Sequence, residues 1–123
     1  MLGAAREAIR SRQVAVAPTC GFHHAGYAKA DAFCTFNGLM VTALALKAEG
    51  LAQHIGILDF DMHYGDGTEN IIQRLSTDFV NHYTAAEEYH SVSKASEFLA
   101  RIPELVAMME GCGVLLYQAG AET

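Results

Sequence analysis

Short apolar runs alternate along the chain with longer stretches in which apolar positions recur at helical spacing. The apolar runs predict four β-strands, at Val14–Ala17, Ile55–Phe60, Phe79–Tyr83 and Val114–Gln118. Strands that alternate with helices are typical of βαβ units. The pattern therefore predicts an α/β fold with a parallel sheet flanked by helices.

The periodic stretches predict four helical segments, at residues 1–12, 38–49, 68–75 and 98–109. Asn37 is a suitable N-cap for the second helix, and Gly50 ends it. In the fourth stretch Pro103 removes a backbone donor, so we expect the helix to kink or restart there.

Length and composition favour one domain. The 123 residues are half hydrophobic and contain no internal repeat or linker, so residues 1–123 are interpreted as a single domain. There is no apolar run long enough to span a membrane and no signal-peptide pattern at the start, and a cytoplasmic protein is expected, with no membrane partner. A net charge of −6 argues against nucleic acid as a partner.

Polar residues gather where the predicted strands end. Asp59, Asp61 and His63 follow the second strand at positions i, i+2 and i+4, which share one side of an extended segment. Carboxylate and imidazole donors in this arrangement suit a divalent metal such as Zn²⁺. The ordinary alternative is a strand end followed by a Gly-Asp-Gly turn, with His63 as a solvated loop residue.

Two adjacent histidines, His23 and His24, follow the first predicted strand in a glycine-containing loop. Of two neighbouring imidazoles, one can accept a proton while the other carries positive charge. Each would need a carboxylate to orient it. The loops after parallel strands meet at one edge of the sheet, so both polar groups are expected at the same edge.

Three ordered motifs carry a family resemblance. The segments PTCGFHHAGYAKADAFCTFNG and LDFDMHYGDGTEN resemble the tandem-histidine, FCxFN and DxDxH segments of the histone deacetylase and acetylpolyamine amidohydrolase superfamily. The later LLYQAGAE is similar to the strand and turn that deliver a third metal ligand. The resemblance implies an arginase/deacetylase-like α/β/α fold and zinc-dependent hydrolysis of an N-acetyl amide.

The resemblance also implies a role for each matching residue. Asp61 and His63 would bind zinc, His24 would be the general base and then the general acid, and His23 its neighbour. Asp59 would be the carboxylate partner of His23, and Asp66 that of His24. A K⁺ ion would lie near Asp59, and Phe33 would form an aromatic wall of the substrate tunnel.

The match departs from the family pattern towards the carboxyl end. The third zinc ligand of the family is an aspartate, and Glu122 stands at the matching position, one residue before the last. The oxyanion-stabilising tyrosine segment of the family has no match, nor do the strands that precede its first motif. These departures favour a middle portion of the family domain, incomplete at both ends and impaired in catalysis.

Several functions stay open at this point. Acetyl-lysine and acetylated polyamines are both suitable substrates for the resembling site. The alternative is a catalytically inactive remnant that acts as a binding or assembly module. An arginase-like site with two manganese ions is less favoured, since the carboxylates for a second ion are not evident. Sheet edges and apolar faces left uncovered in a partial domain predict a homo-oligomer.

Overall fold

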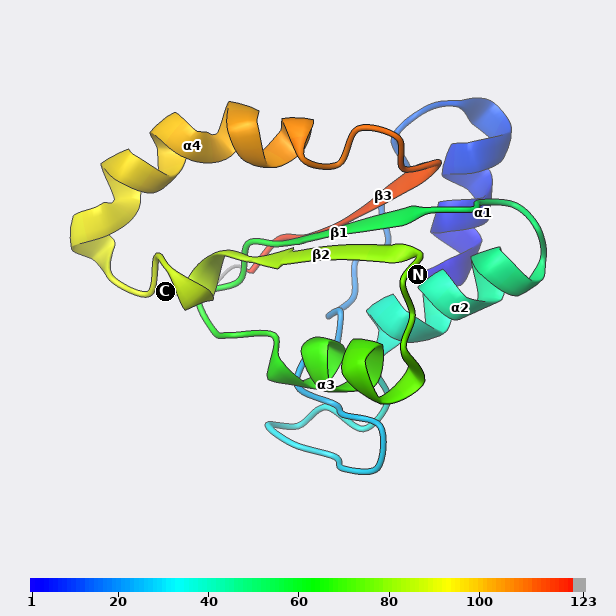
Figure 1. The fold of residues 1–123 in the computed structure, drawn as a ribbon, viewed down its shortest axis with the longest axis horizontal. Coiled ribbons are helices and arrows are strands. Elements are labelled where there is room, and N and C mark those ends of the chain that lie inside the picture. Colours follow the sequence, from blue (N-terminus) through cyan, green and yellow to red (C-terminus); the bar gives the residue numbers. More distant parts are fainter. Residues whose placement is uncertain (121–123) are drawn as a thin grey trace.

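The computed structural model describes residues 1–120. Within them the chain forms four α-helices, two short 3-10 helices and three β-strands (Figure 1). In chain order the elements are α1 (Leu2–Ser11), α2 (Gly38–Ala48), β1 (Ile55–Asp59), α3 (Asp66–Leu75), β2 (Val80–Thr84), η1 (Ala85–Glu87), η2 (Val92–Lys94), α4 (Ala95–Ala107) and β3 (Val114–Gln118).

The three strands form one parallel sheet in the order β2-β1-β3, with β1 in the centre. Ile55 pairs with Val80 on one side and with Val114 on the other, so the strands start level and end level. The predicted parallel sheet flanked by helices is therefore confirmed. Predicted bounds differ from the observed ones by at most one residue for β1 and β2 and agree for β3.

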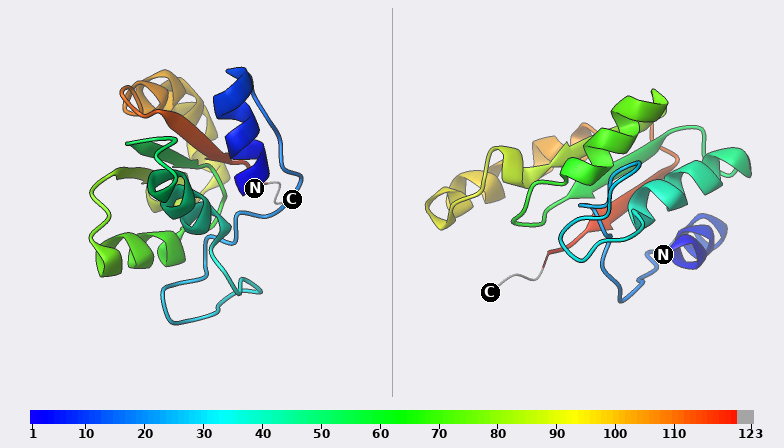
Figure 2. Two further views of the ribbon diagram at one scale, coloured as in Figure 1. Left: turned by 90° about the vertical axis from the view of Figure 1, so that its right-hand side faces the viewer. Right: turned by 90° about the horizontal axis from the view of Figure 1, so that it is seen from below.

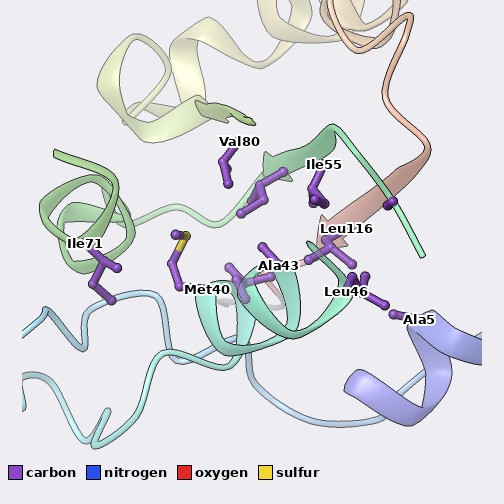
Figure 3. Close-up of a cluster of buried hydrophobic side chains, with 11 residues drawn as sticks. Ala5, Met40, Ala43, Leu46, Ile55, Ile71, Val80 and Leu116 are labelled. Atoms are coloured by element: carbon purple, nitrogen blue, oxygen red, sulfur yellow. The ribbon is translucent and has the colours of Figure 1, made fainter. Parts of the chain in front are cut away.

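One face of the sheet packs against α2 and α3, and α4 lies over the other face (Figures 1 and 2). Side chains alternate between faces along a strand, which places Ile55, Ile57 and Asp59 on the α2 face. Figure 3 shows Met40, Ala43 and Leu46 of α2 directed at the strands there. The other buried apolar members of this core are Ala5, Leu39, Ala52, Ile55, Ile57, Ile71, Val80 and Leu116.

The α4 face carries a smaller cluster of aromatic and apolar side chains. Phe60 makes edge-to-face contacts with Phe98, Tyr117 and Tyr83, at centroid distances of 4.9, 5.5 and 6.4 Å. Towards the other end of β1, Leu105 and Met109 are buried. Gly56 of β1 leaves room for the Met109 side chain, because a Cβ at position 56 would lie 3.0 Å from the Met109 sulfur.

The expected restart at Pro103 is wrong, because α4 runs from Ala95 to Ala107 as one helix with the proline inside it, and the alternative of a kink stays a prediction. The bond that Pro103 cannot make would lead to the carbonyl of Leu99, four residues earlier. Leu99 and Pro103 are both exposed, so water can satisfy that carbonyl.

The predicted strand at Val14–Ala17 is also wrong. The segment has no assigned secondary structure, and Val14 and Val16 are 94% and 80% exposed. Its alternation of valine and alanine matches a strand pattern, but pattern alone does not provide a neighbouring strand. The chain between α1 and α2 instead runs away from the sheet and forms a long loop, which lies below α3 in Figure 1.

Among the described residues no helix is both long and apolar enough to cross a membrane. Cys20, Cys34 and Cys112 are free thiols.

Candidate active site

The carboxyl end of β1 delivers the first two carboxylates of the site. Asp59, the last residue of β1, is fully buried, and its Oδ1 accepts a hydrogen bond from the Asp61 amide at 3.1 Å. Asp61 repeats the arrangement, since its Oδ1 accepts from the His63 amide at 2.8 Å. Asp61 and His63 lie beyond the end of β1 and do not continue the strand. Each is aligned by a hydrogen bond from its backbone amide to the carboxylate two residues earlier.

His23 pairs with Asp59 in the interior. The His23 Nδ1 lies 2.5 Å from Asp59 Oδ2, and its Nε2 lies 3.9 Å from Asp61 Oδ1. Burial disfavours a positive charge on His23, but the hydrogen bond to Asp59 and the negative charges around the ring outweigh it. The pKa of His23 is therefore raised above its usual range.

His24 pairs with Asp66 nearer the surface. The His24 Nδ1 lies 2.7 Å from Asp66 Oδ1, and the side chains are 21% and 52% exposed. The His24 ring contacts the rings of both neighbours, with centroids 4.3 Å from His23 and 6.0 Å from His63. Three imidazoles therefore lie in a row, from the interior to the surface.

The two pairs fix which ring nitrogen carries the proton. An ionised carboxylate accepts hydrogen bonds and donates none, so the Nδ1 of His23 and of His24 must be the protonated nitrogen. When either ring is neutral, its Nε2 then has a free lone pair that can accept a proton. The arrangement provides two oriented bases next to a carboxylate and a third imidazole.

The turn that starts α3 packs directly on both histidines. A Cβ on Gly65 would lie 2.5 Å from Asp59 Oδ2 and 3.4 Å from His23 Nδ1. A Cβ on Gly67 would lie 2.6 Å from both the carbonyl carbon and the oxygen of Ala25. Only glycine allows this approach at either position, which explains the Gly-Asp-Gly sequence in physical terms.

The donor types of the site suit zinc, but the described residues supply an incomplete ligand set. Asp61 Oδ1 and His63 Nδ1 lie 3.2 Å apart, a carboxylate oxygen next to an imidazole nitrogen. Within residues 1–120 there is no group of three metal-binding side chains. Glu122, the expected third ligand, lies outside the described residues. Gly120 lies directly against Asp61, so the segment after β3 does reach this site.

Phe33 lies on the loop between the histidine pair and α2. Its side chain is fully exposed and its φ is 64°, a left-handed conformation that is uncommon for a residue with a Cβ. The same loop carries Asp31, whose pKa is lowered chiefly by the hydrogen bond from Lys29 and also by the nearby His24. The expected part of Phe33 in a substrate tunnel stays a prediction.

Two polar contacts near the site were missed at the sequence level. Asn37 was expected to cap α2, and it also binds the histidine loop and Thr68. The side chain of His82 in β2 is 3% exposed beside α3, with its Nδ1 3.3 Å from Glu69 Oε2. The VNHYT pattern shows that His82 can share the face of Val80, but its partner depends on how α3 packs.

Comparison with known proteins agrees with this geometry. Residues 1–95, about three quarters of the chain, match the family described as the histone deacetylase domain. The chain belongs to the histone deacetylase family. The predicted resemblance to this family is thereby confirmed.

The relatives include plant and bacterial proteins. The deacetylase-family chain is 34% identical over 84 residues to an uncharacterized protein of Picosynechococcus sp., covering 68% of this chain and 28% of the relative. It is 42% identical over 52 residues to histone deacetylase 15 of Arabidopsis thaliana, covering 42% of this chain and 9% of the relative. Acetoin utilization protein AcuC of Staphylococcus aureus is 43% identical over 49 residues, covering 40% of this chain and 12% of the relative.

The fold has a solved counterpart in the HD domain of HDA15. The TM-score is 0.70 at 22% sequence identity, and the alignment covers 97% of this chain and 43% of that domain. At this identity the similarity shows the fold alone. The deacetylase-family chain therefore spans less than half of that domain, and its fold is a partial deacetylase domain.

Proposed function

We propose that the site hydrolyses N-acetyl amides with the help of a bound zinc ion. The observation that carries the proposal is the pair of imidazole–carboxylate contacts beside Asp61 and His63, in a chain of the histone deacetylase family. Family membership supports a deacetylase-like activity. Zinc dependence and the substrate are the further steps that need an experiment.

Asp61 and His63 are the residues that would hold the ion, with Glu122 as the third protein ligand. Zn²⁺ at such a site polarises the amide carbonyl and lowers the pKa of its bound water. In the described residues no contact supports the expected potassium ion near Asp59, whose two oxygens already have partners in His23 and the Asp61 amide. Potassium stays an untested prediction.

The histidines would handle the protons. His24 is the more exposed of the two, so its Nε2 is the better placed to take a proton from water and return it to the leaving amine. Asp66 would keep the His24 ring in the required tautomer. His23, buried with a raised pKa, would hold positive charge next to the reacting group and so stabilise negative charge that develops there.

The substrate class follows from the family rather than from a contact. An acetylated amine, either acetyl-lysine in a peptide or an acetylated polyamine, fits the proposed chemistry. The exposed aromatic side chain of Phe33 would be available to pack on the alkyl part of either one.

Zinc stoichiometry tests the proposal most directly. The purified chain is rinsed with chelator, reloaded with zinc, and measured by elemental analysis together with the His63→Ala variant. We expect about one zinc per chain in the wild type and little in the variant, because three protein ligands are the usual minimum. His54→Ala, which replaces an exposed histidine outside the site, is the matched control and should keep its zinc. Zinc uptake that His63→Ala leaves unchanged would refute the assignment.

A second candidate is an inactive deacetylase-like module that assembles into a homo-oligomer. It is favoured by apolar side chains at the β3 edge, where Tyr117 and Leu115 are 61% and 41% exposed. A free strand edge and apolar side chains of this kind suit association between copies. Light scattering that finds a monomer would contradict the assembly, and a zinc-free oligomer would favour the module over the enzyme.

A further inference from the structure

The side chain of Asn37 is a buried junction between the histidine loop and two helices. Its Oδ1 accepts from the Met40 amide at 3.0 Å, the usual bond of a helix N-cap. Its Nδ2 donates to the Ala25 carbonyl at 3.1 Å and to Thr68 Oγ1 at 2.9 Å. Asn37 and Thr68 are both buried, so these bonds are shielded from water.

Backbone hydrogen bonds also hold the histidine loop against both helices. Residues 21–25 form no strand or helix, and Phe22 has a left-handed φ of 57°. The start of α2 holds the loop at Gly21, whose carbonyl accepts from the Gly38 amide at 3.1 Å. The start of α3 holds it at His23, whose carbonyl accepts from the Thr68 amide at 3.0 Å. Asn37 is the side chain that joins all three segments.

We propose that Asn37 is a positioning residue for His23 and His24, an inference that rests on the proposed function for its catalytic meaning. By fixing the Ala25 carbonyl and Thr68 together, Asn37 sets the distance between the loop and the start of α3. That distance determines whether His24 Nδ1 reaches Asp66 at the start of α3, and the loop that Asn37 holds also carries His23 to Asp59 at the end of β1.

The oxygen of the Asn37 amide caps α2 and its nitrogen binds the histidine loop, so a substitution that changes only the nitrogen separates the two roles. Asn37→Asp retains an oxygen for the Met40 amide, and aspartate is as good an N-cap as asparagine. The same change removes the donor and places a carboxylate oxygen against the Ala25 carbonyl, where it repels. A capping role alone predicts no effect of Asn37→Asp on the histidines, whereas positioning predicts a clear effect.

The experiment measures solvent exchange of the imidazole Nδ1–H protons of His23 and His24 by NMR in the metal-free chain. In Asn37→Asp we expect exchange about tenfold faster for both, the size expected for loss of one buried hydrogen bond. Ile55→Val, a core change at the other end of β1, is the control for general destabilisation and should leave both exchange rates within about twofold. Exchange that is unchanged in a folded Asn37→Asp chain overturns the proposal.

Thr68→Val covers the case in which Asn37→Asp does not fold. Valine has nearly the shape of threonine and removes the Oγ1 that Asn37 binds. We expect faster exchange at His24 in this variant as well, and unchanged exchange overturns the proposal. In an active, zinc-loaded chain, Asn37→Asp should lower kcat with little change in KM. If the chain shows no hydrolysis, the exchange measurement still decides the positioning role, so failure of the proposed function and failure of this inference are distinguishable.

Discussion

The two histidine–carboxylate pairs have nearly the same geometry and opposite surroundings. Asp59 and His23 are buried below the end of the sheet, whereas Asp66 is half exposed at the start of α3. In the interior a broken pair leaves polar groups without water to replace the partner, and at the surface water replaces it readily. Burial therefore makes the first pair a structural element as well as a candidate catalytic one, and leaves the second pair free to exchange protons.

The largest effect is expected for Asp59→Ala. The change leaves the His23 Nδ1–H and the Asp61 amide without acceptors inside the protein. Removing one partner of a buried pair costs about 3–5 kcal/mol of unfolding free energy. Urea denaturation of the metal-free chain measures it, with Asp78→Ala, at an exposed aspartate away from the site, as the control. A loss no larger than that of the control would mean that the buried pair contributes no stability.

The glycines that cover the two pairs come next. An alanine at Gly67 would press its Cβ into the backbone of the histidine loop, and one at Gly65 would press it against Asp59. Both changes should destabilise the fold, by about 1–3 kcal/mol, because overpacked atoms must shift. Gly67→Ala should cost more, since backbone atoms yield less than side chains.

Gly3→Ala is the matched control for these glycines. Gly3 lies in α1, and a Cβ added there would have nothing within 4 Å, so alanine should stabilise by about 0.5–1 kcal/mol through helix propensity. Thermal unfolding of the three variants distinguishes the close approach of the α3 turn from a general glycine effect. Three shifts of the same sign would contradict the packing argument.

The buried pair should also give a pH dependence of stability. The raised pKa of His23 means that the folded chain holds this proton more tightly than the unfolded chain, whose value is about 6.5. The contribution is complete below that value and is lost as the pH rises through the folded pKa. In the metal-free chain, the stability difference between wild type and His23→Gln should therefore shrink as the pH rises above about 6.5. In an Asp59→Asn background the trend should largely disappear, and its persistence there would assign it to another group.

The sequence predicts the parallel sheet well and the loops less well. Apolar runs identify the three strands, most clearly β1, because a strand covered on both faces needs apolar residues at nearly every position. The same rule fails at Val14–Ala17, since a matching pattern does not ensure a neighbouring strand. Pro103 fails as a helix breaker because its side of α4 faces water.

In the candidate site, too, the sequence predicts some features and not others. Motif resemblance places His23, His24, Asp61 and His63 in one region, and the contacts place them together there. The double use of Asn37 could not be predicted, because its bonds to Ala25 and Thr68 depend on how three segments pack. Local spacing predicts which side chains can face one direction, whereas contacts between distant segments need the fold.

The smallest effect on stability is expected for Asp66→Ala, and it sharpens the contrast between the pairs. Asp66 is half exposed and lies in the first turn of α3, so its loss should cost less than about 1 kcal/mol from the His24 contact and the helix dipole together. The His24 ring would nevertheless lose the acceptor that fixes its tautomer, so we expect activity to fall by about 10- to 100-fold, as for other partners that orient an active-site histidine. Urea denaturation and deacetylation of an acetyl-lysine peptide measure the two effects on the same preparation, with Asp66→Asn as the variant that retains an acceptor oxygen. A stability loss as large as that of Asp59→Ala would show that the exposed pair is structural too, and the distinction drawn from burial would then fail.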